Sequence, residues 1–157
     1  MSREYAFVAS GLSAITTVPI FQLLTPTTTS IEILSLNLNN SSSEESFQEI
    51  FTIRRRSTNS TFPAGNAVSP VALNQRDPAT LLIAGTLQAA AGLATAAGSE
   101  GNILCSWGFN DLTGLTYLPV PEERITVEPS AYITGQFMVN TPSAVNWAIT
   151  LNYRELN

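Results

Sequence analysis

The sequence Val145-Asn146-Trp147-Ala148-Ile149-Thr150-Leu151-Asn152-Tyr153-Arg154 alternates between large apolar side chains and small or polar ones. Successive side chains of a β-strand point to opposite faces of its sheet. A period of two therefore predicts a strand that buries one face and presents the other to solvent. We expect a half-buried strand at this end of the chain, and the same alternation can be sought elsewhere.

Similar alternation recurs toward the N-terminus, with turn residues between the segments. The segments expected to form strands are 4–9, 18–24, 30–39, 46–54, 103–109, 114–118, 124–128 and 131–139. Within 30–39 we expect Leu34, Leu36 and Leu38 to share one face. Pro19 predicts an edge strand or a bulge, because proline cannot donate to a sheet ladder. The turn residues Asn140-Thr141-Pro142-Ser143 predict that 131–139 and the last strand form a hairpin.

These eight or nine short strands predict an all-β fold. No segment has a convincing apolar stripe of helical period, and Gly, Pro, Ser and Asn separate the strands. Such a pattern is typical of an antiparallel β-sandwich or barrel. The chain of 157 residues is expected to form a single domain over 1–157. The Ala-rich segment 86–97 contains Gly92 and is flanked by Gly85 and Gly98, so we expect one helical turn or a plain loop there.

Residues 57–79 lack alternation and contain Pro63, Pro70 and Pro78. Loops without secondary structure seldom exceed about 12–15 residues in compact domains, and longer ones are usually functional or disordered. One interpretation is an arm ordered by contact with a partner. The other is a long surface loop packed by its own apolar side chains, which are Phe62, Val68, Val71 and Leu73.

The composition excludes several classes of catalytic chemistry. The chain has no His and no Lys, because all seven basic residues are Arg. It therefore lacks a Ser-His-Asp triad, a Schiff-base lysine and a P-loop lysine. Its single cysteine, Cys105, can form neither an internal disulfide nor a Cys/His zinc site, and its apolar surroundings predict a small buried side chain. We expect no cofactor and no metal.

Charge and hydropathy also limit the partners. The net charge is −5, and the one basic cluster, Arg54-Arg55-Arg56, alternates sides in a strand, so we expect no nucleic-acid partner. The apolar run from Leu81 to Ala97 is too short and too polar to span a bilayer, so we expect no membrane partner. Residues 1–14 faintly resemble a signal peptide, but Glu4 and the early Ser10-Gly11 oppose that interpretation.

The remaining candidate chemistry favours structural roles. Glu44-Glu45 and Glu122-Glu123 are adjacent pairs whose members face opposite ways in a strand, so neither suits two-carboxylate catalysis. Asp111 is expected to cap a turn. Trp107 and Trp147 fall on the apolar sides of their strands, which predicts core packing rather than platforms for a sugar. We therefore expect a protein that is not an enzyme.

The surface chemistry suits protein contact. Thr, Ser and Asn make up 46 of the 157 residues, whereas charged residues are 12%. Burying few charges in an interface avoids their desolvation cost. The candidate contact residues are Arg54, Arg55, Arg56, Phe62, Val68 and Val71.

One segment resembles small virion proteins of tailed bacteriophages. It reads Thr116-Tyr117-Leu118-Pro119-Val120-Pro121-Glu122-Glu123-Arg124-Ile125-Thr126-Val127-Glu128-Pro129, and it is followed by the strand 131–139 and a last strand ending in Arg154-Glu155-Leu156. Leu23-Leu24-Thr25-Pro26 and Ile31-Glu32-Ile33-Leu34 are similar in arrangement. The resemblance implies a jelly-roll-like sandwich, usually a homotrimer, bound outside the capsid as a cement or decoration protein. Residues 57–100 are not covered by it.

We therefore expect a capsid decoration protein that stabilises a phage shell by bridging subunits of the major capsid protein. Its expected location is the capsid exterior of the virion, and the host cytoplasm during assembly. The alternative is a receptor- or carbohydrate-binding β-sandwich domain of a phage fibre or spike. A lectin-like or glycosidase-associated domain ranks third.

Overall fold

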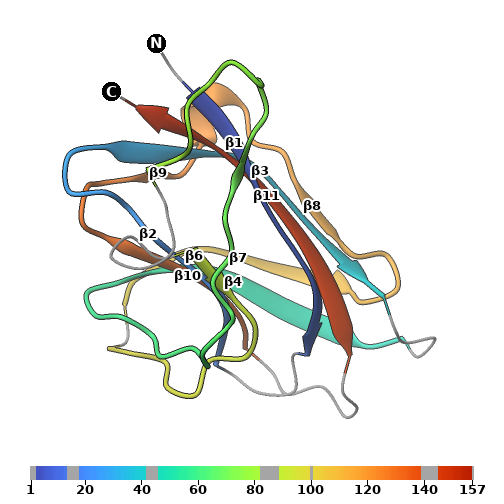
Figure 1. The fold of residues 1–157 in the computed structure, drawn as a ribbon. Coiled ribbons are helices and arrows are strands. Elements are labelled where there is room, and N and C mark those ends of the chain that lie inside the picture. Colours follow the sequence, from blue (N-terminus) through green and yellow to red (C-terminus); the bar gives the residue numbers. More distant parts are fainter. Residues whose placement is uncertain are drawn as a thin grey trace.

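The computed structural model describes residues 3–13, 18–41, 46–81, 89–99, 101–138 and 145–156. These residues contain eleven strands and one short 3-10 helix, η1 (Pro121–Glu123) (Figure 1). The strands are β1 (Arg3–Ser13), β2 (Pro19–Leu24), β3 (Ser30–Asn40), β4 (Gln48–Arg56), β5 (Val71–Ala72), β6 (Ala89–Ala91), β7 (Ile103–Asn110), β8 (Leu115–Tyr117), β9 (Thr126–Val127), β10 (Tyr132–Phe137) and β11 (Asn146–Leu156). Each of the nine segments predicted to be strands overlaps one of these strands.

The strands form two antiparallel sheets that face each other. Sheet A has the order β5-β1-β11-β3-β8, with β9 also paired to β3. Sheet B has the order β6-β2-β10-β4-β7. The large apolar side chains of both sheets meet in one buried cluster between them. The predicted antiparallel β-sandwich is therefore confirmed.

Eight of the strands pair in order from the two ends of the chain toward its middle. β1 pairs with β11, β2 with β10, β3 with β8, and β4 with β7. The pairs β11–β3 and β10–β4 then join these ladders into two sheets. This is the order obtained when one long antiparallel ladder is folded across itself, and it places the first and last strands side by side in sheet A (Figure 1).

The predicted hairpin between 131–139 and the last strand is wrong. β10 lies in sheet B between β2 and β4, whereas β11 lies in sheet A between β1 and β3. The link 139–144 contains the turn residues and lies outside the described residues. It joins two sheets rather than two neighbouring strands, so turn chemistry alone did not identify the pairing.

Two irregularities adjust which side chains face the core. The register of β3 against β11 shifts between Ser35 and Ile33, which leaves Leu34 as an extra, half-buried residue. The prediction that Leu34 shares a face with Leu36 and Leu38 is therefore wrong, because a bulge reverses the alternation. The register of β2 against β10 shifts next to Pro19, which confirms the predicted bulge.

Aromatic side chains form much of the core. The rings of Phe137 and Trp147, from opposite sheets, have centroids 5.0 Å apart. Phe21 and Phe51 stack at 6.4 Å across Gly135 of β10, whose missing side chain leaves room for them. Trp147 is fully buried, as predicted, whereas Trp107 is half-buried between Phe51 and Tyr117.

The long connecting segment, residues 57–102 between β4 and β7, is attached along both sheets. Its strand β5 pairs with β1, and its strand β6 pairs with β2. Thr61 and Ala96 form a bridge within it. Residues 57–79 are irregular, as predicted, except for β5 and isolated bridges. The expectation of a helical turn or loop over 86–97 is wrong at Ala89–Ala91, which form a strand, whereas residues 92–97 are a loop as expected, apart from the bridge at Ala96.

Candidate functional site

The three arginines of β4 divide between two faces, as the alternation predicted. Arg54 and Arg56 are only 6% and 3% exposed and lie on the face of sheet B that points away from the core. Arg56 donates to Thr134 Oγ1 at 3.0 Å and to the carbonyl of Ser99 at 2.9 Å. Arg55 points the other way, with Nη1 3.7 Å from a carboxylate oxygen of Glu128. Arg56 therefore helps to hold the connecting segment on sheet B.

The apolar candidates of the connecting segment also separate. Phe62 and Val68 are half-buried, and Val68 packs against the core cluster. Val71, in contrast, is 67% exposed and lies in β5 at the edge of sheet A. The structure does not gather the six predicted contact residues on one surface, and among them Val71 is the one with a largely exposed side chain.

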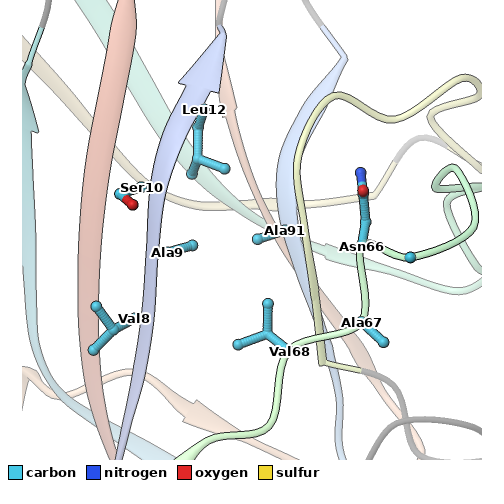
Figure 2. Close-up of a pocket in the computed structure, with 9 residues that line it drawn as sticks. Val8, Ala9, Ser10, Leu12, Asn66, Ala67, Val68 and Ala91 are labelled. Carbon is cyan, nitrogen blue, oxygen red and sulfur yellow. The ribbon is translucent and has the colours of Figure 1, made fainter.

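A shallow cleft of about 340 Å³ separates β1 from the connecting segment (Figure 2). The side chains of Ala9, Val68 and Ala91 point toward one another across it. Leu12 and Asn66 complete the walls shown at its rim. The residues that line this cleft include no titratable side chain, so it offers apolar contact rather than acid or base chemistry.

The face of sheet A that points away from the core carries a continuous set of uncharged side chains. Cross-strand register places Thr150 of β11 between Val8 of β1 and Asn37 of β3, and Asn37 in turn opposite Thr116 of β8. We call this set the uncharged face; its members are Ala6, Val8, Ser35, Asn37, Val71, Thr116, Ala148, Thr150 and Asn152. Short side chains on neighbouring strands make a low-relief surface with little charge to desolvate.

Two boundaries delimit the uncharged face. At one end the charges alternate across the strands: Arg154 lies 3.1 Å from Glu4 and 3.5 Å from Glu32, and Glu32 lies 3.4 Å from Arg124. These two arginines and two glutamates balance in charge. At the β5 edge the exposed side chains are apolar, with Val8 57%, Val71 67% and Leu73 55% exposed.

A buried pair of carboxyl groups was missed as a site by sequence reasoning. Glu49 of β4 is 2% exposed and Asp111 is fully buried. Asp111 accepts a hydrogen bond from the backbone N–H of Phe47 at 2.8 Å, far away in the sequence, and the turn itself is capped by Asn110, which accepts from the N–H of Leu112 at 3.0 Å; the expected cap at Asp111 is therefore wrong. Oε2 of Glu49 has no partner among the described residues. Burial, together with the negative charge of Asp111, raises the pKa of Glu49 to about 7. The available signal was the position of Glu49 on the apolar side of its strand.

A second buried carboxylate anchors the connecting segment. Oε1 of Glu155 accepts from Thr80 Oγ1 at 2.7 Å and from the backbone N–H of Leu81 at 2.8 Å. The hydroxyl of Thr80 also lies 2.6 Å from that of Tyr153. Burial raises the pKa of Tyr153, so its hydroxyl stays protonated and able to donate at neutral pH. This network is structural, because it links β11 to residues 80–81.

Other candidates have ordinary environments. Glu122 and Glu123 are exposed in η1, and Glu44-Glu45 lie outside the described residues. Cys105 was predicted to be buried but is half-buried, because β7 is the last strand of its sheet. Its partial burial raises the pKa of its thiol. Within the described ranges, no three His, Cys, Asp or Glu residues are grouped to hold a metal ion. No helix of the described part is long and apolar enough to cross a bilayer.

Comparison with known proteins returned no match: no protein-family model, curated protein or solved structure is similar enough to this chain to be assigned to it. The functional argument therefore rests on the chain's own surfaces.

Proposed function

We propose that the chain is a non-enzymatic virion structural protein, a decoration protein that binds the outside of a tailed-phage capsid and bridges its major capsid subunits. The observation that carries this proposal is the uncharged face of sheet A, which spans β1, β11, β3 and β8. A face of small, uncharged side chains can be covered by a partner with little desolvation cost. Its apolar edge at Val8, Val71 and Leu73 adds area that gains from burial.

The sandwich in this proposal is a jelly roll. The support is the pairing of first strand with last and second with next-to-last. The eight strands of this ladder also divide equally between the sheets, as β1-β11-β3-β8 and β2-β10-β4-β7. Jelly rolls are common building blocks of viral shells. The sequence resemblance implies three copies, and sedimentation equilibrium of the free protein distinguishes such a trimer from other states of self-association.

Stabilisation follows from mass action. A protein that binds the assembled shell but not its separated subunits favours the assembled state by about 2.7 kcal/mol per site at a hundredfold excess over the dissociation constant. The same gain in free energy is made at many symmetric sites, so the shell resists the pressure of packaged DNA better. No active site is needed for this effect. In this role Val71 would lie in the contact, whereas Arg56 would act indirectly by holding the connecting segment through Ser99. Arg54 instead bonds to Thr52 of β4 and to Met138, the residue that follows β10.

Binding to purified particles that lack the protein tests the proposal. We expect the wild-type chain to saturate regular sites, and Thr150→Arg at the centre of the uncharged face to lose most of its occupancy. Thr27→Arg, in an exposed turn between β2 and β3, is the matched control and should bind as the wild type does. Full occupancy by a folded Thr150→Arg protein would exclude the uncharged face. Absence of wild-type binding would exclude the decoration role and favour the receptor- or carbohydrate-binding alternative.

A further inference from the structure

The two sheets end in strands of very different length. Sheet A ends in β5, with two residues, and in β8 and β9, with three and two. Sheet B ends in β6, with three residues, and in β7, with eight. Short edge strands are one way in which proteins prevent unwanted strand pairing. β7 departs from this arrangement, because it presents a long edge.

The backbone groups of β7 alternate in direction. The N–H of Arg55 donates to the carbonyl of Asn102 at 2.9 Å, whereas the carbonyl of Ile50 accepts from Met138 on the opposite side of β4. Thus Phe51 and Ile53 direct their backbone groups toward β7, and their partners Trp107 and Cys105 face β4. The intervening residues Ser106 and Gly108 direct their N–H and C=O groups outward, where no described strand pairs with them.

The side chains of β7 do not protect this edge. Charged residues and proline commonly block edge pairing, and Ile103–Asn110 contains neither. Ser106 is exposed and short, and Gly108 has no side chain, so a neighbouring backbone could approach both. Two exposed apolar side chains lie near this edge: Ile103 at the start of β7 is 49% exposed, and Leu118, next to the Tyr117 ring that packs on Trp107, is 77% exposed.

We propose that β7 pairs antiparallel with β7 of a second copy of this chain, so that the two copies of sheet B form one continuous sheet across a two-fold axis. An antiparallel strand paired with itself exchanges the same donors and acceptors in both directions, as an isologous interface requires. The absence of charge in β7 also matters, because two copies of net charge −5 can approach there without like charges opposite each other within the paired strands. This contact goes beyond the proposed capsid binding and does not depend on it.

Sedimentation equilibrium of the free protein provides the first test. The average mass of the wild-type protein is expected to rise with concentration, from the mass of one chain to the mass of two. Ser106→Pro should abolish this shift while retaining the fold, because the N–H that it removes points away from β4. Gly108→Lys is a second variant, since a Cβ at Gly108 meets nothing closer than the carbonyl of Glu49 at 4.0 Å. Thr27→Lys adds the same charge at a distance and should still dimerise.

Amide hydrogen exchange identifies the contact. In the concentrated wild-type sample, the amides of Ser106 and Gly108 should exchange more slowly than in the dilute sample, whereas those of Cys105 and Trp107 should be protected in both. A wild-type protein that stays monomeric, or dimers in which Ser106 and Gly108 show no added protection, would overturn the proposal. A trimer that persists in folded Ser106→Pro would also overturn it and would support the homotrimer implied by the resemblance. None of these results depends on whether the protein binds capsids.

Discussion

Glu49 shows how one buried side chain can set the pH dependence of stability. In the folded chain its pKa is about 7, against 4.5 for the unperturbed group. Between these values the folded state holds a proton that the unfolded state has released, so the contribution of Glu49 to stability is fully present below about pH 4.5 and is lost as the pH rises through 7. The carboxyl therefore favours the fold when neutral and opposes it when charged.

We expect Glu49→Gln to be more stable than the wild type at pH 8 by about 1–3 kcal/mol, with the difference largely lost near pH 4, because one pKa unit corresponds to about 1.4 kcal/mol. Urea unfolding at both pH values measures this change. Glu122→Gln, at an exposed position, should show no such pH dependence. Parallel stability curves for the wild type and Glu49→Gln would contradict the assignment.

Gly135 is a second residue on which the core depends. A Cβ there would lie 2.0 Å from Phe21 Cε1 and 2.6 Å from Phe51 Cζ, both on rigid rings inside the sandwich. We expect Gly135→Ala to destabilise the fold by at least about 1–3 kcal/mol through overpacking. Gly108→Ala, at an open position in β7, is the matched control. Equal unfolding free energies for the two variants would contradict this account of the aromatic core.

Among the elements, the connecting segment depends on a few polar anchors. Thr80 links Tyr153 and Glu155, and replacing its hydroxyl leaves a buried carboxylate oxygen with one fewer donor. Thr80→Val should therefore cost about 1–3 kcal/mol. It should also speed proteolysis within 57–81, whereas Thr126→Val, at an exposed position in β9, should change neither. Unchanged cleavage in Thr80→Val would show that β5 and β6 hold the segment without this anchor.

Strand positions could be predicted from the sequence, but strand partners could not. Alternation reports which side of a strand is buried, and it located β11 and the other long strands correctly. It carries no information on which sheet a strand joins, which is why the hairpin of β10 with β11 was wrong. The strands β5 and β6 have only two and three residues, which is too short for an alternating pattern to be recognised. They form because they pair with β1 and β2, which the sequence pattern does not reveal.

The candidate surfaces were predictable only in part. The low charge indicated a contact surface, yet its place on sheet A required the cross-strand register that brings Val8, Thr150 and Asn37 together. The burial of Arg56 could not be inferred from β4 itself, because its partner Ser99 comes from the distant connecting segment. Val71, one of the predicted contact residues, is largely exposed, and its neighbour Ala6 on β1 could not be predicted from the sequence.

At the scale of the whole molecule, the two proposed contacts use different parts of the sandwich. The uncharged face covers sheet A, whereas β7 is the edge strand of sheet B. The ends of β1 and β11 lie together at one end of sheet A, where Arg3 is opposite Glu155. We expect a bulky fusion placed after residue 157 to leave both β7 pairing and the fold intact, because β11 is an inner strand of sheet A whereas Ser106 lies on the outer edge of sheet B; sedimentation of the fusion protein measures this.

The proposed decoration role requires the protein to stabilise a capsid from outside. Its most direct test is the temperature at which DNA escapes from particles made without the protein, from the same particles after wild-type protein is added, and from particles given Thr150→Arg. We expect DNA release to shift to a higher temperature with the wild type and this shift to be lost with Thr150→Arg. The same release temperature with and without bound wild-type protein would contradict it.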